Sequence, residues 1–188
     1  MSIETESPAV NERNVFVGAR LLLAADGFLF LAFLFAYAYL RALNSDGMWH
    51  PSGVNPSTGL GAATTVVVIA AAAVAFAAVR QARIGPAAPG LAWGVVALLT
   101  VAAVLALVQT FDPGFSPHVG GGFGSVFVGF TAAYAVHLLG AVYWSEIVAV
   151  TATRSPSSSD AADSAALSAF VIFLAGVMVI AFVLVYLV

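Results

Sequence analysis

The sequence has no cysteine and no lysine, and only 8% of its 188 residues are charged. Without cysteine there can be no disulfide, no thiolate metal site and no thiol chemistry. The net charge of −3 and the absence of a basic run argue against nucleic-acid binding. Soluble domains usually carry about 25% charged residues, so the composition also argues against a soluble fold.

Apolar residues make up 62% of the chain and are concentrated in five long runs. Each run is close to the ~20 residues that a transmembrane helix needs to cross a bilayer. The sequence therefore predicts an all-α integral membrane bundle of five transmembrane helices. The predicted spans are about residues 15–42, 60–79, 91–111, 123–150 and 167–188.

Residues 1–13 are polar and acidic, and they are predicted to form a tail before a single transmembrane domain at 14–188. A secretory signal begins with a positively charged segment and has a shorter apolar run. The first run is therefore expected to be a retained helix.

The arginines predict the orientation of the bundle. Five of them fall on the side of the N-terminus, and Arg41 alone falls on the other side. Because cytoplasmic loops are enriched in arginine and lysine, the N-terminus is expected inside and the C-terminus outside a prokaryotic cell membrane. The five are Arg13, Arg20, Arg80, Arg83 and Arg154.

Two titratable residues lie deep in the predicted spans, Asp26 in the first and His137 in the fourth. Ionisable groups are costly inside a membrane and usually have a partner there. Asp26 is therefore expected to be protonated, hydrogen-bonded, or both. Asp26 could make a polar contact that holds the first helix in the bundle, or it could act directly in handling protons or lipids.

Other polar side chains accompany this possible pair. Tyr134 lies three residues before His137 on the same helical face, and Thr131 lies six residues before it. Glu146 falls near the predicted inner end of the fourth span and could simply be interfacial. A haem held by two histidines would need a second histidine at the depth of His137, and the sequence offers none.

The predicted outer loops carry the remaining candidates. Trp49 is placed like an interfacial anchor, Gln109 is expected to cap or bridge, and Asp112 begins a loop at Asp-Pro. His50 and His118 could form a metal site together with Asp46 or Asp112, but their spacing matches no known motif. The chain has no recognisable catalytic constellation.

Spans one to four, in order, resemble subunit III of the haem-copper terminal oxidases (cytochrome c oxidase) in its five-helix bacterial and archaeal form. The stretch from Leu23 to Tyr37 resembles the family's serine–glutamate–x–methionine–phenylalanine–phenylalanine segment, with Asp26 in place of the membrane-buried glutamate. Trp49-His50-Pro51 resembles the tryptophan–proline of the following loop. Gln109 and Asp112 resemble a glutamine-x-x-glutamate motif.

The resemblance continues into the fourth span. Phe123 to Phe127 resembles the tyrosine–glycine–serine–x–phenylalanine entry of the family. Thr131 to His137 resembles threonine–glycine–x–histidine–x–x–histidine, with Tyr134 in place of the first histidine. The last span departs from the family, because it lacks the usual tryptophan, histidine and aspartate near its middle.

The resemblance implies a subunit without a catalytic site, haem or copper of its own, all cofactors lying in the partner subunits. It implies packing on catalytic subunit I, association with subunit II, and phospholipid held between the helices. It also implies support for complex stability and for proton uptake in aerobic respiration. Asp26 and His137 would approach each other in the bundle.

Three other functions are compatible with the residues. One is a small transporter in which Asp26 and His137 form a proton relay. Another is the related accessory subunit of a nitric oxide reductase. The third is a membrane metal enzyme that uses His50 and His118.

Overall fold

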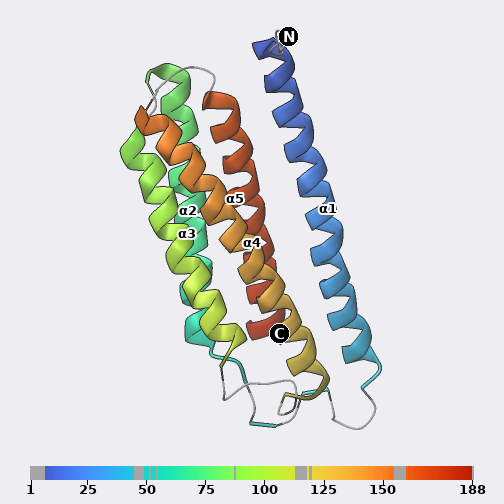
Figure 1. The fold of residues 1–188 in the computed structure, drawn as a ribbon. Coiled ribbons are helices and arrows are strands. Elements are labelled where there is room, and N and C mark those ends of the chain that lie inside the picture. Colours follow the sequence, from blue (N-terminus) through green and yellow to red (C-terminus); the bar gives the residue numbers. More distant parts are fainter. Residues whose placement is uncertain are drawn as a thin grey trace.

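The computed structural model describes residues 7–44, 49–50, 52–53, 55–86, 88–112, 118, 120–154 and 160–187. All regular structure in these residues is helical, in the order α1 to α5 followed by a short π-helical turn, η1 (Figure 1). The helices are α1 (Pro8–Ala42), α2 (Thr58–Ile84), α3 (Pro89–Thr110), α4 (Gly121–Arg154), α5 (Asp160–Phe182) and η1 (Val183–Leu187).

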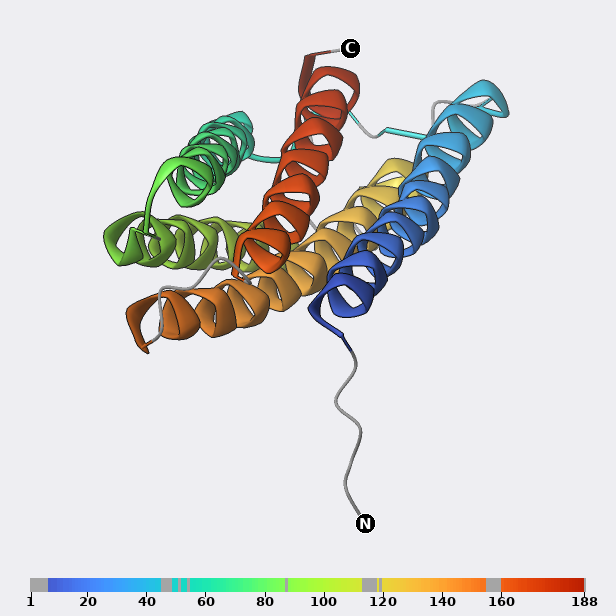
Figure 2. The ribbon, with the colours of Figure 1, turned by 90° about the horizontal axis from the view of Figure 1, so that it is seen from above.

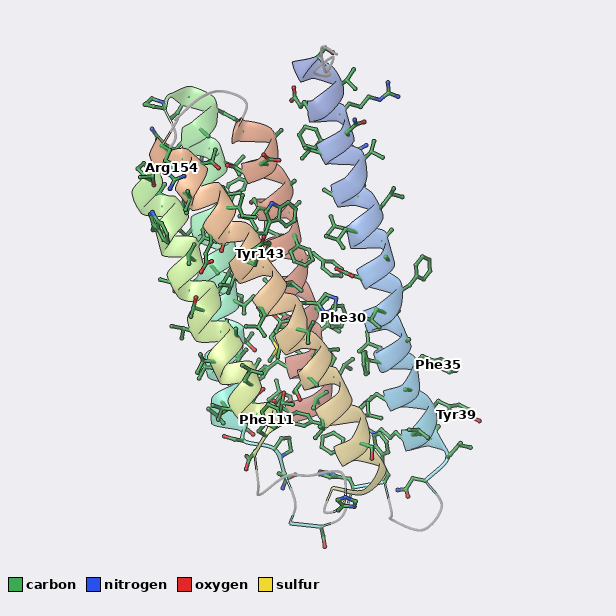
Figure 3. The ribbon with its side chains drawn as sticks, in the orientation of Figure 1. Phe30, Phe35, Tyr39, Phe111, Tyr143 and Arg154 are labelled. Atoms are coloured by element: carbon green, nitrogen blue, oxygen red, sulfur yellow. The ribbon has the colours of Figure 1, made fainter. Side chains whose placement is uncertain are left out.

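The described part of the chain contains five helices long and apolar enough to cross a membrane. The chain is therefore a multi-pass membrane protein, as the five apolar runs predict. The two termini lie toward opposite ends of the bundle (Figure 1). Arg154 marks one end of the helices and Phe111 the other (Figure 3). We call the end with Arg80, Arg83 and Arg154 the arginine-rich end.

The helices extend beyond the apolar runs that identify them. α1 begins at Pro8, inside the segment predicted to be a tail, because proline is well tolerated in the first helical turn, where its missing N–H has no partner to lose. α4 continues to Arg154 and α5 begins already at Asp160. Hydropathy marks the part of a helix that lies in lipid, whereas backbone hydrogen bonding carries the helix further into polar sequence.

Small side chains bring α2, α3, α4 and α5 close together. Ala71, Ala102 and Ala141 are completely buried, and many other alanines pack around them in one core cluster. Small residues at helix contacts let backbones approach closely in a membrane. Threonines within the helices donate to the carbonyl one turn earlier, as Thr64 does to Leu60 at 2.9 Å, so their hydroxyls are satisfied without leaving the bundle.

α1 stands apart from this compact group. Seen along the bundle, it lies beside α4 and α5 and away from α2 and α3 (Figure 2). In the apolar 18-residue stretch that marks α1 as a membrane span, only 11% of the residues are buried inside the protein, whereas 39% are buried in the corresponding stretch of α3. The contacts that hold α1 are therefore few, and they include the polar residues singled out in the sequence.

At the end of the bundle opposite the arginine-rich end, aromatic side chains connect α1 to its neighbours. Tyr37 donates a hydrogen bond of 2.8 Å to the carbonyl of Leu184 in η1. Trp49 packs its ring against Tyr37 and Phe123 at centroid distances of 5.5 and 5.8 Å. Only 9% of the Trp49 surface is exposed. Its side chain therefore packs inside the protein, whereas its sequence position suggests an interfacial lipid anchor.

Candidate functional site

Asp26 and His137 meet in the structure. His137 Nε2 lies 3.3 Å from Asp26 Oδ1, and both side chains are largely buried, with 18% and 11% of their surface exposed. Asp26 lies near the midpoint of α1, and His137 near the midpoint of α4. Each helix runs for roughly 25 Å in either direction from the pair, at 1.5 Å per residue. The pair therefore lies well within the depth of the membrane.

A backbone carbonyl fixes the protonation of one imidazole nitrogen. His137 Nδ1 lies 2.7 Å from the carbonyl oxygen of Ala133, one turn earlier in α4. Because a carbonyl oxygen can only accept a hydrogen bond, Nδ1 must carry a proton. Nε2 is left to face the carboxyl group.

This assignment leaves two arrangements in which the pair carries no net charge. Either a neutral carboxylic acid donates to Nε2, or a protonated Nε2 donates to a carboxylate. Both place one proton between Asp26 and His137, and both give the pair a net charge of zero. Removing that proton would leave an uncompensated carboxylate in an apolar environment, at a large cost in free energy.

Phe30 forms an aromatic wall beside the pair. Its ring centroid is 5.1 Å from that of His137, and Phe30 is 3% exposed. Phe130, Tyr134 and Phe173 surround Phe30 at centroid distances of 5.9 to 6.1 Å. The two rings are tilted by 58° to each other, so Phe30 packs against the imidazole and encloses the pair on this side. Phe30 lies one turn after Asp26 in α1, and within an almost wholly apolar run nothing in the sequence distinguishes it as the residue that packs on His137.

The hydroxyl groups near the pair donate hydrogen bonds to backbone carbonyls. Thr131 donates to the carbonyl of Val128 at 3.2 Å, and Tyr134 donates to the carbonyl of Leu174 at 2.9 Å. Asp26 Oδ2 is buried without a partner among the described residues. The Thr131 and Tyr134 hydroxyls thus donate to the backbone and not to the pair.

An apolar cleft of about 260 Å³ opens between α1, α4 and α5 next to the pair. Phe30 belongs both to the cleft and to the wall beside His137. The size of the cleft and its almost wholly apolar lining suit a segment of hydrocarbon chain. Its lining residues are Gly27, Phe30, Leu31, Leu34, Phe130, Phe173, Val177 and Ile180.

The other sequence candidates lie away from this pair. Glu146 is exposed on α4. Gln109 is 3% exposed and lies beside the Tyr186 hydroxyl, but its amide nitrogen makes no hydrogen bond within the described chain. The Tyr186 ring lies so close to Gly61 that a Cβ there would lie 2.6 Å from it, so a larger residue at position 61 would displace this ring.

The loop histidines form no metal site with the described residues. His50 packs its ring on Phe123 at a centroid distance of 4.5 Å, and Asp112 lies just beyond the end of α3. No group of three histidine, cysteine, aspartate or glutamate side chains in the described ranges could hold a metal ion. Asp46 lies outside those ranges.

No model of a known protein family matches the sequence, and no curated protein is significantly similar to it. The function must therefore be argued from the arrangement of the residues.

Proposed function

We propose that the chain is a non-catalytic membrane subunit of a larger respiratory complex, of the type of subunit III of the haem-copper terminal oxidases. In this proposal it packs on catalytic subunit I, alongside subunit II, in a prokaryotic cell membrane. Haem and copper belong to the partner subunits. The chain itself holds phospholipid and stabilises the complex.

The observation that carries the proposal is the Asp26–His137 pair. The resemblance to the oxidase subunit includes an acid in the first span and a histidine in the fourth, and these two side chains lie 3.3 Å apart. They join helices that are otherwise only loosely in contact. The cleft beside them offers a site for an acyl chain.

The surroundings of the pair favour a structural role for it. A transporter needs a polar path and a site for its substrate, and the neighbours Thr131 and Tyr134 both bond to backbone carbonyls instead. A position near the middle of α1 and α4 also suits a helix-joining contact better than proton uptake at a membrane surface. We therefore favour the subunit function over the transporter.

The proposal can be tested by purifying the native protein in a mild detergent. We expect it to co-purify with histidine-rich partner subunits whose haem gives an optical spectrum, and we expect subunit identification to find an oxidase catalytic subunit. A colourless preparation without partners would contradict the proposal. A haem-containing nitric oxide reductase partner would identify the related accessory subunit instead.

Lipid binding has its own test in the cleft. Gly27 lines the cleft, and a Cβ on it would meet no atom within 4 Å. Gly27→Phe should therefore fill the cleft and lower the amount of phospholipid retained per purified complex, as measured by mass spectrometry. Gly176→Phe is the matched control, because Gly176 is an exposed α5 glycine with equally open surroundings that does not line the cleft. Equal lipid retention by both variants would argue against the lipid site.

A further inference from the structure

One surface of α4 carries a carboxylate on the outside of the bundle. We call it the Gly140 face. Its apolar and aromatic members are well exposed: Val136 by 65%, Leu139 by 47%, Tyr143 by 69% and Ile147 by 49%. α4 lies along one edge of the bundle, and Tyr143 projects from it (Figures 2 and 3). The face consists of Val136, Leu139, Gly140, Tyr143, Glu146 and Ile147.

The depth of Glu146 in the membrane follows from its neighbours on α3. The 22 residues of α3 extend over about 33 Å, close to the ~30 Å of a bilayer's hydrocarbon core. Trp93, one turn into α3, donates from its ring nitrogen to the Thr153 hydroxyl of α4 at 3.3 Å. Thr153 is therefore near the membrane surface at the arginine-rich end.

Glu146 lies two helical turns from Thr153 toward the middle of α4, about 10 Å along the helix axis. The carboxylate is thus placed within the hydrocarbon layer and on the outer surface of the bundle. No described residue forms an ion pair or a hydrogen bond with it. A charged group facing lipid at this depth is costly, and a basic group on a partner would offset the cost.

Gly140 makes the same surface flat. A Cβ at Gly140 would meet no atom within 4 Å, so the bundle itself does not require glycine there. Glycine in a helix interior is also less favourable than alanine. A glycine at a helix surface does, however, allow a second transmembrane helix to approach closely.

We propose that the Gly140 face is the docking site for a transmembrane helix of a partner subunit, which carries an arginine, lysine or histidine side chain opposite Glu146. The charge of Glu146 selects a basic partner, and the open space over Gly140 admits a helix backbone. The Tyr143 hydroxyl lies one turn from Glu146 and supplies a second hydrogen-bonding group. This inference rests on the proposal that the chain is a subunit of a larger complex, and it names the surface that the complex uses.

The absence of cysteine allows a direct test. Tyr143→Cys would be labelled with a photoreactive maleimide in the native complex, and Phe76→Cys on α2 would serve as the control, since Phe76 is 53% exposed. We expect position 143 to cross-link to a partner transmembrane peptide with a basic residue within one turn of the attachment point. Position 76 should yield lipid adducts. Cross-links from position 143 to lipid, to a second copy of this chain, or to a helix without a basic residue would overturn the proposal.

Association measurements with three variants complete the test. Glu146→Gln keeps the shape and removes the charge, and it should weaken retention of the partner by about tenfold, the effect of one interhelical polar contact. Gly140→Leu should weaken retention of the partner further, because the leucine side chain fills the open space over position 140 that the partner helix would occupy. Gly176→Leu, at an equally open α5 glycine, should leave retention unchanged.

The outcomes separate the two proposals. If the wild-type chain purifies without any partner, the proposed subunit function fails. If the wild-type complex forms but Glu146→Gln and Gly140→Leu retain the partner as well as wild type does, only the docking site fails. Thermal unfolding of each isolated chain checks that the substitutions leave the fold intact, as the exposure of both residues leads us to expect.

Discussion

α1 and the α2–α5 group are held in place by different means. In the group, alanines such as Ala71 and Ala102 are completely buried and let the helix backbones approach closely. α1 is far more exposed, and its attachment relies on the Asp26–His137 pair and on aromatic contacts. In a membrane, apolar side chains gain little free energy by moving from lipid into a helix interface, because lipid tails are as apolar as they are. A helix is therefore held by close packing or by polar contacts. This molecule uses one solution in each region.

The largest effect is expected from breaking the polar contact of α1. Asp26→Ala leaves His137 buried without its partner, and the loss of unfolding free energy should be on the order of 3 kcal/mol if the pair is ionised. Denaturant unfolding in detergent would measure it. A loss nearer 1 kcal/mol would indicate a neutral hydrogen bond instead.

The double variant Asp26→Leu with His137→Leu is the control for this prediction. Replacing both partners by apolar groups removes the uncompensated polar atom, so most of the lost stability should return. Spin labels on cysteines at Leu21 and Leu139, both exposed, would report whether α1 moves away from α4 in the single variant. If the double variant were as unstable as the single one, the pair would not be the contact that matters.

An intermediate effect is expected from enlarging a buried alanine in the group. Ala102 is completely buried, so Ala102→Leu should overpack the core and cost about 1–3 kcal/mol. The same change at Ala32, which is exposed on α1, should cost almost nothing. Comparable losses at both positions would mean that α1 packs as tightly as the other helices do.

The smallest effect is expected at the aromatic end of α1. Tyr37→Phe removes the hydrogen bond to the Leu184 carbonyl and should cost about 1 kcal/mol. A modest fall in the unfolding midpoint would agree with this. Unchanged tryptophan fluorescence would show that the ring at position 37 still packs on Trp49. An unchanged midpoint would show that the bond contributes nothing to the attachment of α1.

The number of helices and their lipid-exposed character could be predicted from the sequence, because hydropathy acts locally and each span needs only its own residues to satisfy its backbone. Asp26 and His137 could be singled out for the same reason, since each is a polar residue in an apolar run. Their proximity could be inferred only through the resemblance, because hydropathy carries no information on which helix faces which. The helix ends were harder to predict, as Pro8 and Asp160 show.

Local sequence patterns alone therefore establish the five apolar spans and the positions of the costly polar groups. Their surroundings come from the packing of the helices: the Ala133 carbonyl that orients the imidazole, the Phe30 wall, the cleft, the burial of Trp49, and the exposure of Glu146. Those features depend on the rotation and tilt of each helix about its neighbours. Rotation and tilt are set by side-chain packing between segments distant in the sequence, which no local pattern encodes.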